Sequence, residues 1–178
     1  MAHHVSLCSR NDRSRVLRAL LSVAPTIGIA LSLLPSAARS QSWGVYRDSV
    51  YDCRLEYPSS LFTREPLDVT QKFERFSGPD ARTYFRVMGV DNNDDLTPAA
   101  VKAKYLSSDV PGEIVYERTK SYFLVLSGYR GGSIFYTKVA VSANKRTICI
   151  LEITYPREAR PALDDIVTRM SWSFKAGD

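Results

Sequence analysis

The sequence FLVLSGYRGGSIFY, residues 123–136, has the clearest pattern of secondary structure in this chain. It predicts a strand from Tyr122 to Tyr129 and a second strand from Ile134 to Val141, joined by the tight turn Arg130–Ser133. Two glycines in that turn supply the positive φ angles that short hairpin connections need. Residues 123–126 are apolar at every position, as are 148–151. Strands of this kind lie in the centre of a sheet that is covered on both faces.

The segments on either side of this hairpin extend the same sheet. We expect a strand at 50–57, a hairpin from 72–76 and 83–90, a strand at 114–118, and a last strand at 147–154 after a turn at 143–146. Thr97 and Pro98 suit the start of a helix that continues to about residue 107. A second helix follows Pro156, and its apolar stripe consists of Leu163, Ile166, Val167, Met170 and Phe174. The predicted fold is α+β, a largely antiparallel β-sheet with helices packed on it.

Residues 1–40 have the pattern of a cleavable export signal peptide. Four arginines precede an uncharged apolar run of sixteen residues, 19–34, and small residues follow at 35–40. The alternative is a permanent membrane anchor, but the run falls short of the roughly 20 residues that span a bilayer. We expect cleavage after Ser40 or Ala38, a short lead-in at 41–49, and a single globular domain at 50–178. Membrane contact is then limited to the leader before cleavage.

The leader also holds the basic residues and histidines that would otherwise suggest nucleic-acid binding, catalysis or metal binding. The chain has 24 basic and 19 acidic residues, and 1–40 holds five of the basic residues and one of the acidic ones. The remaining chain has 19 basic and 18 acidic residues, a net charge near +1. The high isoelectric point is therefore no sign of nucleic-acid binding. Both histidines, His3 and His4, lie there too. Without histidine the domain lacks the base of the common nucleophilic triads and the usual zinc ligands. No cofactor-binding motif appears in it either. We therefore predict no catalytic residue, no metal and no cofactor.

Two cysteines remain, Cys53 and Cys149, 96 positions apart. An even number in an exported protein favours a disulfide, and each alternates with apolar residues on a predicted strand. The alternative is a pair of buried free thiols. The bond requires the two strands to be neighbours, and it would contribute on the order of 4 kcal/mol.

Three features are candidate binding sites. Tyr129 and Arg130 at the hairpin turn could bind a carboxylate or phosphate, although a structural turn is the simpler interpretation. The loop 91–95 has oxygen ligands at alternate positions as calcium loops do, but Leu96 stands where such loops need glycine, which favours a loop that caps the next helix. Five tyrosines that alternate with apolar residues could form an aromatic recognition surface or could be buried singly in the core: Tyr116, Tyr122, Tyr129, Tyr136 and Tyr155.

The chain resembles a known family in several short motifs. They are Leu55-Glu56-Tyr57-Pro58 with Leu61-Phe62, 96–100, 123–131, Ile134-Phe135-Tyr136, Tyr155-Pro156 and 166–170. These motifs are similar to those of PsbP-like domains, the fold of the extrinsic photosystem II protein and of a small Ran-binding protein. They are closer still to a group of uncharacterised exported proteins from alphaproteobacteria such as the rhizobia. The resemblance implies an α/β/α sandwich, export, and a role in binding or assembly, and it assigns no contact residue.

From these features we predict a non-enzymatic binding or accessory module in the periplasm or outside a Gram-negative cell. Its partner would be a protein or a small molecule. One alternative is a small histidine-free hydrolase or lyase that uses carboxylates with Tyr or Arg, which needs two acids in one cleft. Another is a structural envelope protein, and no residue in the chain separates that role from binding.

Overall fold

The computed structural model describes residues 41–177 except 69 and 104–111. The predicted leader, 1–40, lies outside the described residues. Within the described part, no helix is long and apolar enough to cross a membrane.

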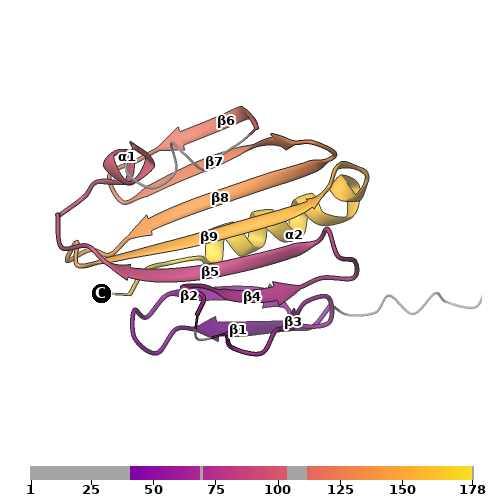
Figure 1. The fold of residues 1–178 in the computed structure, drawn as a ribbon, viewed down its shortest axis with the longest axis horizontal. Coiled ribbons are helices and arrows are strands. Elements are labelled where there is room, and N and C mark those ends of the chain that lie inside the picture. The colour runs from indigo at the N-terminus through magenta and orange to yellow at the C-terminus, as the bar shows by residue number, and fades with distance from the viewer. Residues whose placement is uncertain (1–40, 69, 104–111, 178) are drawn as a thin grey trace, which may run out of the picture. The chain divides into compact units, whose positions relative to one another are not determined.

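A seven-stranded antiparallel sheet forms the centre of the fold (Figure 1). Its spatial order is β3-β4-β5-β9-β8-β7-β6. The strands are β3 (Thr63–Arg64), β4 (Glu74–Ser77), β5 (Tyr84–Asp91), β6 (Glu113–Thr119), β7 (Phe123–Arg130), β8 (Ser133–Val141) and β9 (Thr147–Pro156). A separate two-stranded sheet pairs β1 (Trp43–Arg47) with β2 (Arg54–Pro58). The helices are α1 (Pro98–Val101), a 3₁₀ turn (Arg157–Ala159) and α2 (Arg160–Ser173).

The two faces of the large sheet carry separate apolar clusters. On one face, Phe85 and Leu151 belong to a cluster with Met170 of α2 and residues of the β1–β2 sheet. On the other face, Leu124 and Ile150 pack with Val101 of α1. Strand β9 contributes to both clusters, as predicted for 148–151. The apolar run of β7 contributes Leu124 and Leu126 to the second cluster, whereas Phe123 and Val125 line a groove on the other face. The result is the predicted α+β sandwich.

The predicted hairpin at 122–141 forms, and Arg130 pairs with Ser133 across its turn. Gly131 has the predicted positive φ, 57°, but Gly132 does not. The strand pairs β4–β5, β6–β7 and β8–β9 also match the predicted segments to within a few residues.

The N-terminal boundary differs from the prediction. Residues 43–47 of the predicted lead-in form β1, whose Tyr46 is buried in the core. The strand predicted from residue 50 begins instead at Arg54, because the Asp48 carboxylate accepts the backbone N–H of Val50 and of Tyr51 and turns the chain there. Residues 43–47 therefore belong to the folded domain.

The two predicted helices are both present. Thr97 caps α1, its side chain accepting from the backbone N–H of Ala100. The described part of α1 ends at Val101, and the predicted continuation at 104–107 lies outside the described residues. In α2, Leu163, Val167 and Met170 form the buried stripe, and Phe174 follows as the C-cap.

Cys53 and Cys149 form a disulfide, with Cα atoms 5.7 Å apart. Both residues are fully buried. Cys149 lies on β9 and Cys53 directly precedes β2, so the bond fastens the two-stranded sheet to the centre of the large one. Of the two alternatives left open by the sequence, the structure contains the bonded one.

Candidate functional site

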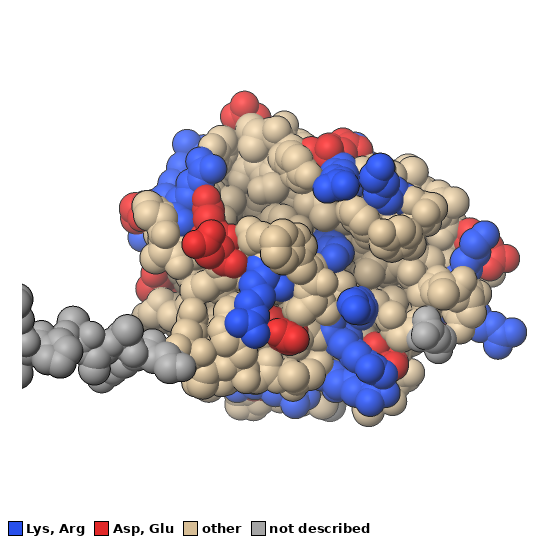
Figure 2. Space-filling view, turned by 180° about the vertical axis from the view of Figure 1, so that it is seen from behind, with Lys and Arg blue, Asp and Glu red and all other residues tan. Residues whose placement is uncertain are grey.

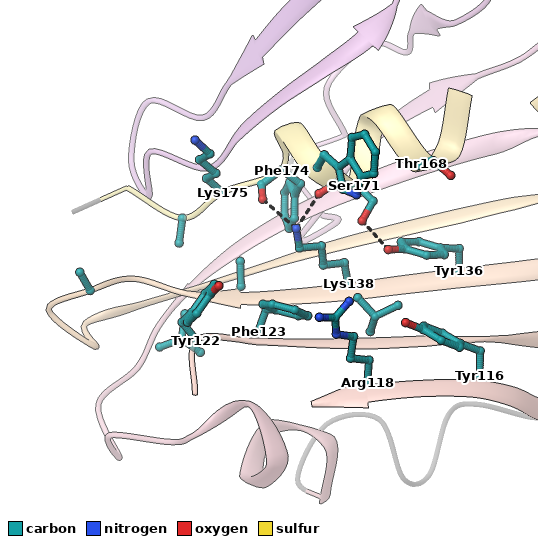
Figure 3. Close-up of a pocket in the computed structure, with 16 residues that line it drawn as sticks. Tyr116, Arg118, Tyr122, Phe123, Tyr136, Lys138, Thr168, Ser171, Phe174 and Lys175 are labelled. Atoms are coloured by element: carbon teal, nitrogen blue, oxygen red, sulfur yellow. Dashed lines mark hydrogen bonds between the residues drawn. The ribbon is translucent and has the colours of Figure 1, made fainter. Parts of the chain in front are cut away.

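A groove of about 780 Å³ lies beside the C-terminal half of α2 (Figure 3). Helix α2 packs against β2 and β9 and leaves the same face of β6, β7 and β8 uncovered. The groove has these three strands as its floor and the end of α2 as its wall. In the space-filling view of this face, blue Lys and Arg side chains and several red Asp and Glu side chains lie among uncharged tan surface (Figure 2).

Strand register arranges the floor of the groove in rows. Arg118 of β6 pairs with Val125 of β7, and Val125 pairs with Lys138 of β8. The next row along the strands contains Tyr116, Ser127 and Tyr136. Directly paired residues project to the same face of a sheet, so each row lies on the groove side. Two cations therefore flank one apolar residue.

Lys138 occupies a position that an apolar residue would normally take. It is half-buried, and its Nζ donates to the carbonyl oxygens of Ser171 at 2.5 Å and Phe174 at 3.2 Å. These carbonyls end α2, where a cation is favoured by the helix dipole. Burial, together with the nearby charge of Lys175, lowers the pKa of Lys138. Lys138 thus joins the floor of the groove to its wall.

The charge of the groove is of one sign. Arg118, Lys138 and Lys175 line it, and none of the described lining residues is Asp or Glu. Arg118 lies 5.9 Å from the centre of the Phe123 ring and forms no ion pair with a described residue. The site is therefore suited to an anion.

Exposed aromatic side chains line the groove on both sides. Trp172 of α2 is 78% exposed, Tyr122 is 63% exposed and Tyr116 is 48% exposed. Tyr136 is half-buried, and its hydroxyl contacts the Ser171 hydroxyl at 2.5 Å. Burial raises the pKa of Tyr136, so this hydroxyl stays protonated at neutral pH.

The sequence had left two interpretations of its five tyrosines, and the structure divides them. Tyr116, Tyr122 and Tyr136 line one groove, whereas Tyr155 is buried in the core and its hydroxyl donates to Asp164 at 3.0 Å. Tyr129 packs at the margin of the core.

The predicted pair Tyr129 and Arg130 is not brought together. Neighbouring residues of a strand point to opposite faces, and here Arg157 covers the Tyr129 ring at 3.9 Å while Arg130 lies near Phe135 on the α1 face. Neither residue lines the groove. A ligand contact by either one alone stays a prediction.

The loop at 91–95 leads into α1, whose N-cap is Thr97. The buried Asn92 side chain donates to the carbonyls of Leu96 and Lys145, and its oxygen accepts from the backbone N–H of Leu96. These bonds use both N–H donors of the amide and one lone pair of its oxygen, so the side chain holds the loop in shape. Among the described residues, no group of three or more His, Cys, Asp or Glu side chains could hold a metal ion.

A cluster of acids also lines a small cavity between β3 and β4. The cavity has a volume of about 40 Å³, and Glu65, Asp68 and Glu74 contribute to it. Each carboxylate is engaged: Glu65 accepts from Arg75 at 3.0 Å, Glu74 from Tyr46 at 3.1 Å, and Asp68 from the backbone N–H of Thr70 at 2.9 Å. The space suits a few water molecules and excludes an organic substrate.

Two solved structures are similar to this chain. The solution structure of cyanobacterial PsbP (CyanoP) from Synechocystis sp. PCC 6803 matches with a TM-score of 0.55 and 13% identity, over 88% of this chain and 98% of that one. The chain has the PsbP-like fold. A crystal structure from Bacteroides thetaiotaomicron matches with a TM-score of 0.42 and 14% identity, over 70% of this chain and 44% of that one. No family model and no curated protein matches the sequence.

Proposed function

We propose that the protein is an exported, non-enzymatic binding module and that the groove beside α2 holds a small-molecule ligand. The observation that carries the proposal is the groove itself, with exposed aromatic side chains, three cations and no acid among its described lining residues. Its volume of about 780 Å³ lies within the range of roughly 300–1,000 Å³ that small-molecule sites occupy.

The residues of the groove favour binding over catalysis. A hydrolase or lyase based on carboxylates needs two acids that share a cleft with the substrate. The groove offers none in its described lining, and the acids of the small cavity are held by their own partners. The resemblance to PsbP-like domains also implies a binding or accessory role.

The predicted leader and the buried disulfide support an extracytoplasmic location. Disulfides persist in oxidising compartments such as the bacterial periplasm. The bond between Cys53 and Cys149 is fully buried, as structural disulfides of exported proteins are.

A dye titration tests the proposal. Nile red, an uncharged dye whose emission rises in apolar surroundings, is added to the purified protein. We expect saturable binding by the wild type and weakened binding by Thr168→Trp, because Thr168 is exposed on α2 and lines the groove, so that an indole there would occupy ligand space. Ala162→Trp is the matched control, since Ala162 is exposed on the same helix outside the groove. Absence of saturable binding, or equal loss in both variants, would contradict the proposal and favour a structural envelope role.

A further inference from the structure

The row of Arg118, Val125 and Lys138 sets the distance between two groove cations. Adjacent strands lie about 4.7–4.9 Å apart, so the backbones of β6 and β8 are separated by about 10 Å at this row. Both side chains are long enough to meet above Val125. Figure 3 shows the Arg118 guanidinium beside Phe123 and the Lys138 side chain extending toward the end of α2. The two cations lie 5.9 Å and 5.5 Å from the centre of the Phe123 ring.

Both cations have hydrogen-bond donors to spare. A lysine ammonium has three N–H donors, and Lys138 gives two of them to the carbonyls that end α2. An arginine has five, and Arg118 has a ring contact with Phe123 and no ion pair among the described residues. With Lys175 nearby, this is positive charge that no described acid of the groove balances.

The surroundings of this row are apolar. Phe123 and Ala140 form the next row of the floor, and Val141 and Ala143 extend it away from the cations. Phe174 and the exposed Trp172 stand on the helix side. A ligand placed here meets charge at one end and apolar surface along the rest of its length.

We propose that the ligand is a free, single-chain amphipathic anion. Its carboxylate, or another anionic head, lies above Val125 between Arg118 and Lys138, and its apolar chain lies along Phe123 toward Trp172. This inference rests on the function proposed above and adds the chemical class of the ligand.

The position of Lys138 favours a free molecule over a membrane surface. Binding to a bilayer uses cations that project from an exposed face and snorkel to the headgroups. Lys138 is instead half-buried on the floor and tied to the end of α2. An anionic head must enter the groove to reach it.

Calorimetric titration with matched surfactants tests the inference. Dodecanoate and dodecyltrimethylammonium have the same chain and opposite charge, and each is used below its micelle concentration. We expect dodecanoate to bind at least about tenfold more tightly, which corresponds to about 1.4 kcal/mol. Equal affinities would overturn the inference, and continued binding of Nile red would then leave the proposed function standing.

Variants locate the anionic head. We expect Arg118→Gln to weaken dodecanoate binding by about tenfold, the effect of one charge-assisted hydrogen bond, and to weaken Nile red binding less than that, because the dye carries no charge. Arg82→Gln is the charge-matched control, since Arg82 pairs with Glu158 outside the groove and its loss changes the net charge equally. Arg118 lies on the exposed edge strand β6, so its substitution leaves the core intact. An equal effect of the two variants would overturn the placement of the head.

Vesicles of phosphatidylglycerol separate a free ligand from a membrane surface. We expect no co-sedimentation of the protein with these vesicles at physiological ionic strength. Co-sedimentation that Arg118→Gln abolishes would overturn the inference that the ligand is a free molecule, because Arg118 would then bind a lipid headgroup in a bilayer.

Discussion

Reduction of the disulfide is the perturbation whose effect on stability can be worked out most directly. The bond joins Cys53 to Cys149 across 96 positions, so it constrains most of the described domain in the unfolded state. In the chain-entropy model, a closed loop of roughly 100 residues corresponds to about 4.7 kcal/mol at 25 °C. We therefore expect reduction to lower the free energy of unfolding by about 4–5 kcal/mol.

Urea unfolding with and without dithiothreitol measures this difference. With a urea dependence of about 2 kcal/mol per molar, the midpoint should fall by roughly 2 M on reduction. The double variant Cys53→Ala, Cys149→Ala serves as a second route to the same state, and it should match the reduced wild type apart from a small packing loss. Adding reductant to the double variant should change nothing.

A loss below about 1 kcal/mol on reduction would refute the reasoning. It would mean that the unfolded chain is not constrained by the bond, or that the two thiols do not form it. Alkylation of the unfolded protein without reductant separates these outcomes, because a bonded pair does not react.

Three further predictions concern the turns and the titrating groups. Gly131→Ala should destabilise the protein by about 1–2 kcal/mol, because residue 131 has a φ of 57°. Gly132→Ala should have almost no effect, and urea unfolding compares the two variants. Burial raises the pKa of Tyr46, so its hydroxyl stays protonated in the fold but ionises near pH 10.0 in the unfolded chain. Stability should therefore fall as the pH rises above about 10, and Tyr46→Phe should make that fall shallower in unfolding curves recorded between about pH 9 and 11. Hydrogen bonds from Arg54 and a second arginine lower the pKa of Asp52 from 3.8 to about 2. The contribution of the Asp52 carboxylate to stability should therefore be lost as the pH falls through that window. Asp52→Asn should remove that part of the acid transition, and asparagine tolerates the φ of 53° at this position. A pH dependence unchanged by either substitution would contradict these assignments.

The large sheet could be predicted because its signals are local. The apolar run at 123–126, the glycines at 131 and 132, and the polar turn at 143–146 each fix a strand or a turn through nearby residues. The β1 strand could not be predicted in the same way. It has five residues, WGVYR, and only Tyr46 is buried. Its conformation therefore depends on tertiary contacts, namely the pairing with β2 and the packing of the Tyr46 ring.

The groove was only partly visible in the sequence. Tyr116, Tyr122 and Tyr136 were recognised as candidates for an aromatic surface, but their common face depends on the register of three strands. Lys138 carried the clearest overlooked signal, since it interrupts an otherwise apolar face of the strand 134–141. Tyr129 and Arg130 combine an aromatic ring and a guanidinium at a turn, but neighbouring residues of a strand place their side chains on opposite faces of the sheet.

Amide chemical-shift mapping during a dodecanoate titration tests whether the groove beside α2 is the ligand site. We expect shifts concentrated on β6, β7, β8 and the last turn of α2, with the largest near Val125 and Lys138. The amides of β3 and β4, on the far edge of the sheet, should stay unchanged. Shifts concentrated on α1 and the loop before it, around Leu96 and Val101, or no saturable shifts at all, would contradict this placement.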